Sequence, residues 1–99
     1  MTRRSKDWNE GLAIDLKDPT FAAEFIMGAL EEGATIQEAL SKVIRLHGVK
    51  EFAEKADMAS SNLLRALDTR HNPTQATLNR LLAPFGLKIS VQPTFQRAA

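Results

Sequence analysis

The sequence contains no cysteine and no tyrosine, and its aromatic residues are five phenylalanines and one tryptophan. Without cysteine, disulfides and thiolate metal sites are excluded. The two histidines, His47 and His71, have no supporting ligands at a metal-binding spacing, so we expect no metal and no cofactor. No apolar run approaches the ~20 residues that span a bilayer, and none follows the basic N-terminus as in a signal peptide. We therefore expect a soluble, cytoplasmic protein.

Motifs of catalysis are also missing. There is no glycine-rich phosphate loop, and neither histidine lies in a motif that would activate a serine nucleophile. The acidic pair Glu31–Glu32 falls at the end of a predicted helix, where a solvated charge is ordinary. Phe21, Phe25 and Met27 follow helical spacing, which favours core or dimer contacts over a cofactor pocket. We expect no enzymatic activity.

The composition is that of one globular domain, but the charge is unevenly distributed. Of the 99 residues, 43% are hydrophobic and 25% are charged. Residues 1–41 contain four Lys/Arg and eight Asp/Glu, whereas residues 42–80 contain seven and four. Residues 81–99 add two basic residues and no acidic one. This asymmetry fits one face for a basic partner and another for a polyanion, although a solvated surface of uneven charge is the alternative.

Apolar periodicity and capping signals predict a mostly helical chain. Asp18 and Pro19 can begin a helix that ends near Gly33, and Thr35 with Glu38 has capping-box spacing for a second helix that ends at Gly48. Two short helices follow, separated by residues 57–59, and then the turn "HNPT". A final helix over "QATLNRLLAPFG" should end near residue 83 because of the proline that follows.

The segment "LKISV" alternates as a half-buried strand should: Leu87, Ile89 and Val91 are apolar, with polar residues between them. A lone strand leaves its ladder groups unpaired, so it would pair with the N-terminal segment or with the same strand of a second subunit, as in a homodimer. The predicted fold is a compact five-helix domain with one C-terminal β-strand. It comprises an N-terminal arm (1–17, partly ordered, with Trp8 of unassigned role), the domain (18–92) and a tail (93–99).

The brief interruption at residues 57–59 predicts a helix-turn-helix. Asp57 occupies the turn position where glycine is usual, and aspartate tolerates a left-handed backbone better than most residues. Ser60 or Ser61 would cap the second helix. The outward positions Ser61, Asn62 and Arg65 can all hydrogen-bond to base edges in the major groove. An ordinary corner between two helices, with a polar outer face, is the alternative.

From about residue 16 to 91 the sequence resembles the antitoxin regulators of toxin–antitoxin (addiction) modules, which have a lambda-repressor/Cro-type helix-turn-helix. "LKDPTFAAEFIMGALEEG" is similar to the family's N-terminal helix. "EALSKVIRLHGVKEFAEKADMASSNLLRALDTRHNPTQATLNRLLAPFGLKISV" is similar to its DNA-binding block.

The resemblance implies a dimeric transcriptional repressor, associated with the nucleoid, that binds its own operator and neutralises a small basic toxin. The residues that would read or frame bases are Ser60, Ser61, Asn62 and Arg65. The residues that would hold phosphates are Lys50, Lys55, Arg70, Asn72 and Thr74. A stand-alone phage- or plasmid-type repressor and a protein-interaction module without DNA binding remain as alternatives.

Overall fold

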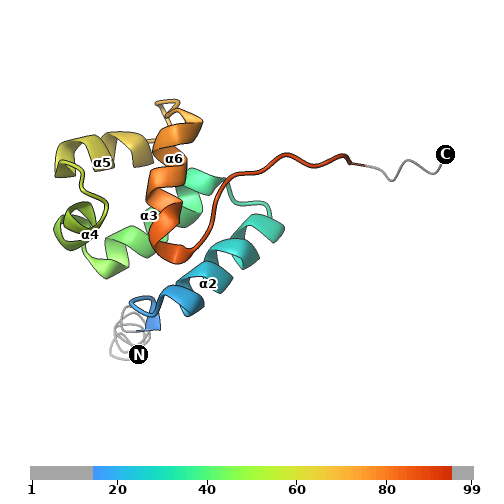
Figure 1. Cartoon of the computed structure of the whole chain (residues 1–99), viewed down its shortest axis with the longest axis horizontal. Coiled ribbons are helices and arrows are strands. Elements are labelled where there is room, and N and C mark those ends of the chain that lie inside the picture. The colour runs from blue at the N-terminus through green and yellow to red at the C-terminus, as the bar shows by residue number, and fades with distance from the viewer. Residues whose placement is uncertain (1–14, 95–99) are drawn as a thin grey trace, which may run out of the picture.

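Five α-helices and a short 3-10 helix make up the described part of the chain, residues 15–94 of the computed structural model (Figure 1). The elements are α2 (Pro19–Glu31), α3 (Ile36–His47), α4 (Val49–Lys55), α5 (Ser60–Leu67), α6 (Gln75–Leu82) and η1 (Ala83–Phe85). The prediction of a mostly helical, compact domain is confirmed. Among these helices, none is long and apolar enough to cross a membrane. Trp8 and most of the predicted N-terminal arm lie outside the described residues.

The helix boundaries follow the predicted capping signals. The Asp18 side chain accepts from the Thr20 N–H at 2.9 Å, and Pro19 is the first residue of α2. At the start of α3 both halves of the capping box form: Thr35 accepts from the Glu38 N–H at 3.1 Å, and the Glu38 carboxylate accepts from the Thr35 N–H at 2.9 Å. These bonds satisfy amide groups that a helix end would otherwise leave without a partner.

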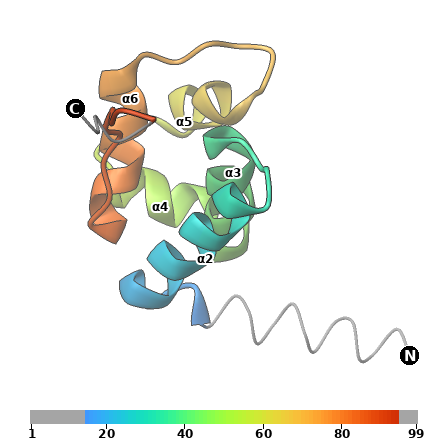
Figure 2. The ribbon, with the colours of Figure 1, turned by 90° about the vertical axis from the view of Figure 1, so that its right-hand side faces the viewer.

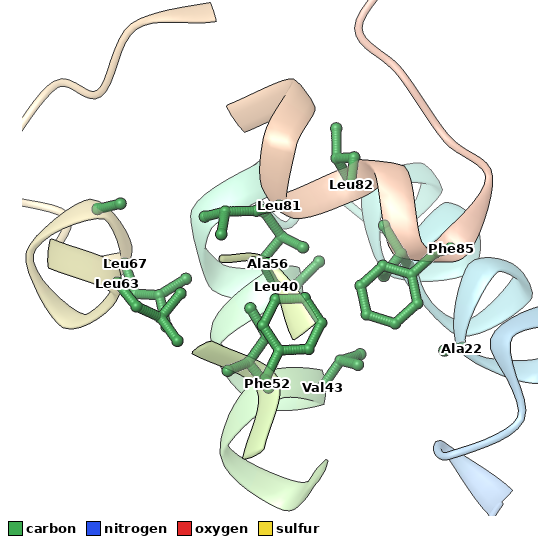
Figure 3. Packing of buried hydrophobic residues seen from close by; sticks show 14 of the residues in the cluster. Ala22, Leu40, Val43, Phe52, Ala56, Leu63, Leu67, Leu81, Leu82 and Phe85 are labelled. Atoms are coloured by element: carbon green, nitrogen blue, oxygen red, sulfur yellow. The ribbon is translucent and has the colours of Figure 1, made fainter. Parts of the chain in front are cut away.

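A single apolar core lies between the helices, and α3 packs against α2, α4 and α5 around it. Phe52 of α4 is fully buried and stacks on Phe85, with ring centroids 5.5 Å apart (Figure 3). Leu40, Leu63 and Leu81 bring α3, α5 and α6 to the same centre. The loop between α5 and α6 arches over one end of the helices (Figure 2). Burial of the apolar faces therefore fixes where α5 sits, which positions the site described below.

The strand predicted over Leu87–Val91 is wrong for the single chain. After Gly86, whose φ of 73° turns the backbone, residues 87–94 leave the helices as an extended segment (Figure 1). A β-strand requires a neighbouring strand with which it exchanges ladder hydrogen bonds. Among residues 15–94 the structure has no strand that could pair with this segment. Ile89 instead donates its N–H to the Asn79 side chain at 2.7 Å.

Candidate nucleic-acid interface

The turn between α4 and α5 redirects the chain within a few residues. Ala56 is the C-cap of α4, and Asp57 adopts a left-handed conformation with φ of 55°, as predicted for this position. The Met58 N–H then returns to the Ala53 carbonyl at 2.9 Å. Among the described residues, Asp57 is the only non-glycine residue with positive φ. The turn thus aims α5 in a new direction at the cost of one left-handed residue.

One face of α5 is buried and the other is open to solvent. Leu63, Ala66 and Leu67 anchor the helix in the core. The exposed residues include every base-reading candidate and one apolar residue: Ser60, Ser61, Asn62, Leu64 and Arg65. The expected outward orientation of the candidates is therefore observed.

The N-terminal end of α5 differs from the prediction. Ala59, and not Ser60 or Ser61, occupies the N-cap position, and no side chain caps the helix. The extended backbone ends at Ala59, so Ser60 is the first helical residue. Both serines therefore lie inside the first turn of α5, and neither occupies the N-cap position. The first amide groups of α5 therefore have no side-chain acceptor from the cap position, and their partial positive charge points out of the helix end.

Arg80 of α6 holds the turn that precedes α5. Its Nη2 donates to the Asp57 carbonyl at 2.7 Å, and its Nε donates to the Ala56 carbonyl at 3.2 Å. The Asp57 carboxylate lies 3.9 Å from the same guanidinium but is fully exposed, so solvent screens this ion pair. The two hydrogen bonds from Arg80 to main-chain carbonyls tie the turn to α6.

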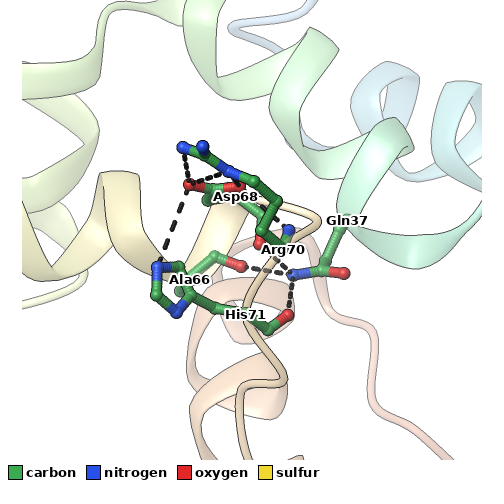
Figure 4. A network of polar contacts seen from close by, with 5 residues as sticks. All are labelled: Gln37, Ala66, Asp68, Arg70 and His71. Atoms are coloured by element: carbon green, nitrogen blue, oxygen red, sulfur yellow. Dashed lines mark hydrogen bonds and ion pairs between the residues drawn. The ribbon is translucent and has the colours of Figure 1, made fainter.

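Gln37 of α3 holds the chain that follows α5. Its side-chain Nε2 lies 2.9 Å from the Ala66 carbonyl, 3.1 Å from that of Asp68 and 3.2 Å from that of His71 (Figure 4). An amide nitrogen has two hydrogens, so the three carbonyls share two donated protons. Together, Gln37 and Arg80 tie both ends of α5 to neighbouring helices.

Asp68 and Arg70 form an ion pair just after α5. The Arg70 Nη2 lies 2.8 Å from the Asp68 Oδ2, and the Arg70 Nε and N–H also donate to this carboxylate (Figure 4). These bonds hold the pKa of Asp68 well below its ordinary value and raise the pKa of Arg70. The guanidinium expected to contact phosphate is thus already paired within the chain.

An open hollow borders the exposed face of α5, between the turn, the α5–α6 loop and α6. It has a volume of about 570 Å³. Four predicted site residues line it, namely Asn62, Arg65, Asn72 and Thr74. The hydroxyl of Thr74 is engaged in capping α6, since it accepts from the Thr77 N–H at 3.1 Å. The structure therefore brings base-reading and phosphate candidates together on one side of α5.

Basic residues that the sequence did not single out lie on the other side of α5. A second hollow there is lined by Lys42 and Arg45 of α3 together with Leu64 and Arg70. Nothing in the spacing of α3 marks Lys42 and Arg45, because their position beside α5 depends on how α3 packs. Arg80 was missed for the same reason, although it is the basic residue nearest to the turn carbonyls.

Two predicted phosphate contacts fall outside these hollows. Lys50 is exposed on α4. The Lys55 Nζ lies 3.5 Å from Nε2 of His47, the last residue of α3.

His47 is buried, its Nδ1 has no hydrogen-bond partner among the described residues, and its ring packs edge-on against Phe52. Within residues 15–94 no group of three His, Asp or Glu residues could hold a metal ion.

Comparison of the chain with protein-family models, curated proteins and solved structures gives no significant match. Any functional conclusion therefore depends on the site geometry and on the resemblance of the sequence motifs.

Proposed function

We propose that this protein is a sequence-specific DNA-binding repressor in which α4 and α5 act as a helix-turn-helix. The carrying observation is that α5 exposes a face of hydrogen-bonding side chains while Arg80 and Gln37 fix both of its ends. A rigid helix with such a face suits the major groove, where base edges present distinct donor and acceptor patterns. In this role Asn62 would read adenine and Arg65 guanine, with Ser60 and Ser61 framing them.

Phosphate contacts would set the register of the helix on the duplex. The uncapped N-terminus of α5 presents its amide groups and the positive end of the helix dipole to a phosphate. The expected cationic and polar contacts are Lys50, Lys55, Arg70, Asn72 and Thr74. We add Lys42 and Arg45 to this proposal, because they line the same hollow as Leu64. Arg70 would exchange its bond to Asp68 for a phosphate, which makes its net contribution smaller than that of an unpaired arginine.

We propose further that the protein is the antitoxin of a toxin–antitoxin module, with a small basic toxin as partner. The supporting observation is charge. Glu24 and Glu31 are exposed on α2, Glu32 follows it directly and Glu38 is exposed in the first turn of α3, while α2 itself contains no Lys or Arg. An acidic surface on this helix complements a basic protein while the α5 side of the molecule faces DNA. If the protein is an antitoxin, the neighbouring reading frame should encode a basic protein of similar size. A stand-alone repressor would have no such neighbour.

Fluorescence anisotropy tests the DNA-binding proposal directly. The purified protein is titrated into a labelled duplex from just upstream of its own gene, with a scrambled duplex as control and two salt concentrations. Binding to the native duplex alone, weakened by salt, supports an autoregulating repressor. Equal weak binding to both duplexes, or no binding at low salt, contradicts sequence-specific recognition by α5.

A further inference from the structure

Leu64 is the one apolar residue on the exposed face of α5, whose other exposed residues are Ser60, Ser61, Asn62 and Arg65. It is 39% exposed, and it belongs neither to the buried core nor to the partly buried residues that pack against the core. An exposed leucine is ordinary on a protein surface in general. This one lies among the residues proposed to read bases, where an apolar side chain needs an apolar group to contact.

Exposed basic residues of α3 lie beside Leu64. Lys42 and Arg45 line the same hollow as Leu64, on the α3 side of α5. The Arg45 Nε donates to the neutral Ser41 hydroxyl at 2.9 Å. Within residues 15–94 neither Lys42 nor Arg45 forms an ion pair. Both charges are therefore unneutralised next to an apolar side chain.

The two acidic residues that line this hollow, Glu38 and Asp68, are already engaged within the chain. Glu38 accepts from the Thr35 N–H at 2.9 Å in the capping box of α3. The Asp68 carboxylate accepts from the Arg70 Nη2 at 2.8 Å. The group that best complements Leu64 and its surroundings is thus apolar and has negative charge beside it.

We propose that Leu64 contacts the 5-methyl group of a thymine in the major groove, an inference that rests on the proposed function. The thymine methyl is the one apolar group in the pattern by which base edges differ in this groove. On the base edge, C5 lies farther from the centre of the pair than O4 does. The methyl group is therefore the part of that edge nearest to the phosphates of its own strand. A leucine next to two cations matches a methyl group next to phosphates.

Leu64 and the polar base-reading residues lie on different sides of α5. Asn62 and Arg65 line the hollow that α6 and the α5–α6 loop border, whereas Leu64 lines the hollow beside α3. A helix in the groove then meets hydrogen-bonding groups along one side and the methyl group along the other. The thymine accordingly lies toward the strand whose phosphates Lys42 and Arg45 would contact.

Deoxyuridine tests this contact, because it pairs as thymine does and lacks only the methyl group. Each thymine of the native duplex is replaced in turn, and fluorescence anisotropy gives the Kd for the full chain. At one thymine or more, the wild-type Kd should rise about 4-fold, the effect of removing one buried carbon group.

Variants of Leu64 connect the effect to this side chain. Leu64→Ala should bind the unmodified duplex more weakly, and its Kd should not change further with deoxyuridine at that position. Leu64→Met keeps an apolar side chain and should retain the sensitivity to the methyl group. Circular dichroism checks that both variants remain helical, as expected for an exposed position.

Lys42→Ala is the matched control from the same hollow. It should weaken binding to every duplex alike and reduce the salt slope by about 1, because a phosphate contact carries no base preference. The rise in Kd caused by deoxyuridine should stay about 4-fold in this variant, since Leu64 is intact.

Two failures are distinguishable. If the wild type binds its native duplex specifically but no deoxyuridine weakens it, or if deoxyuridine weakens wild type and Leu64→Ala equally, this inference is overturned and the proposed function stands. A Leu64 that contacts a protein partner instead of a base would give that result. A wild-type chain that does not distinguish the native from the scrambled duplex overturns the proposed function, and this inference with it.

Discussion

The Arg80 guanidinium donates to the main-chain carbonyl of Asp57 at 2.7 Å, which ties α6 to the turn that aims α5. The second bond, from Arg80 Nε to the Ala56 carbonyl, makes this a two-point contact across 24 residues of sequence. The direction of α5 thus depends on a helix that comes after it in the chain.

Arg80→Ala should therefore destabilise the protein by about 1 kcal/mol, since two hydrogen bonds from a charged but half-exposed donor are lost. Urea unfolding followed by circular dichroism measures the change. Arg45→Ala is the control, because within residues 15–94 the Arg45 side chain bonds only to Ser41 on its own helix. Equal losses for both variants would show that the turn does not need Arg80.

Two substitutions of Gln37 should destabilise the protein to different degrees. Gln37→Ala removes the donor shared by three carbonyls, one of them on buried Ala66, and should cost about 1–2 kcal/mol. Gln37→Glu should cost more, because it points a carboxylate at carbonyl oxygens. Hydrogen exchange should quicken between residues 66 and 72 in both variants. A Gln37→Glu protein as stable as wild type would contradict the donor role of this side chain.

Asp57 should respond to substitution through its backbone. With φ at 55°, glycine fits the turn without strain and alanine does not. Asp57→Ala should therefore be about 1 kcal/mol less stable than Asp57→Gly. Both variants lose the same exposed carboxylate, so the comparison isolates the left-handed conformation. Thermal unfolding of the pair measures it, and equal stability would remove the conformational argument.

His47 should make stability depend on pH. Burial lowers the pKa of its imidazole below the ordinary value of 6.5, and the Lys55 charge lowers it further, against a smaller opposing effect of Glu51. The unfolded chain then binds a proton before the folded chain does, so the free energy of unfolding falls as the pH drops below about 6.5.

Urea unfolding at pH 7.5 and pH 5.5 measures this loss. The loss should shrink in His47→Leu, which also removes the unpartnered Nδ1. His71→Gln changes an exposed histidine and should keep the wild-type dependence. A pH dependence that persists unchanged in His47→Leu would assign it to other groups.

Arg65 should matter for DNA rather than for folding. It is exposed on α5, and Arg65→Ala should weaken binding to the native duplex by about 1–3 kcal/mol and relax sequence preference. Lys17→Ala removes the same charge from the exposed chain before α2 and should cause only a small loss that is equal on all sequences. Unchanged specific affinity of a folded Arg65→Ala protein would exclude Arg65 from base reading.

Local chemistry in the sequence determined where helices begin and end. The helix caps at Asp18, Thr35 and Glu38 form hydrogen bonds to amides no more than three residues away. The left-handed conformation of Asp57 belongs to its own turn. The residues close by in the sequence therefore suffice to predict these features. The outward face of α5 also followed from periodicity alone. The cap of α5 did not, because the path of the turn decides which residue comes first in the helix.

Only the tertiary structure decided which distant groups meet. Gln37 and Arg80 look like ordinary surface residues in the sequence. They reach carbonyls 23–34 residues away because α3 packs beside α5 and α6 approaches the turn that precedes it. The alternation of Leu87, Ile89 and Val91 correctly marks an extended segment, yet a strand also needs a partner, which no single segment can specify. Burial of one common core fixes these long-range contacts, and the sequence pattern of each helix alone carries no information about its neighbours.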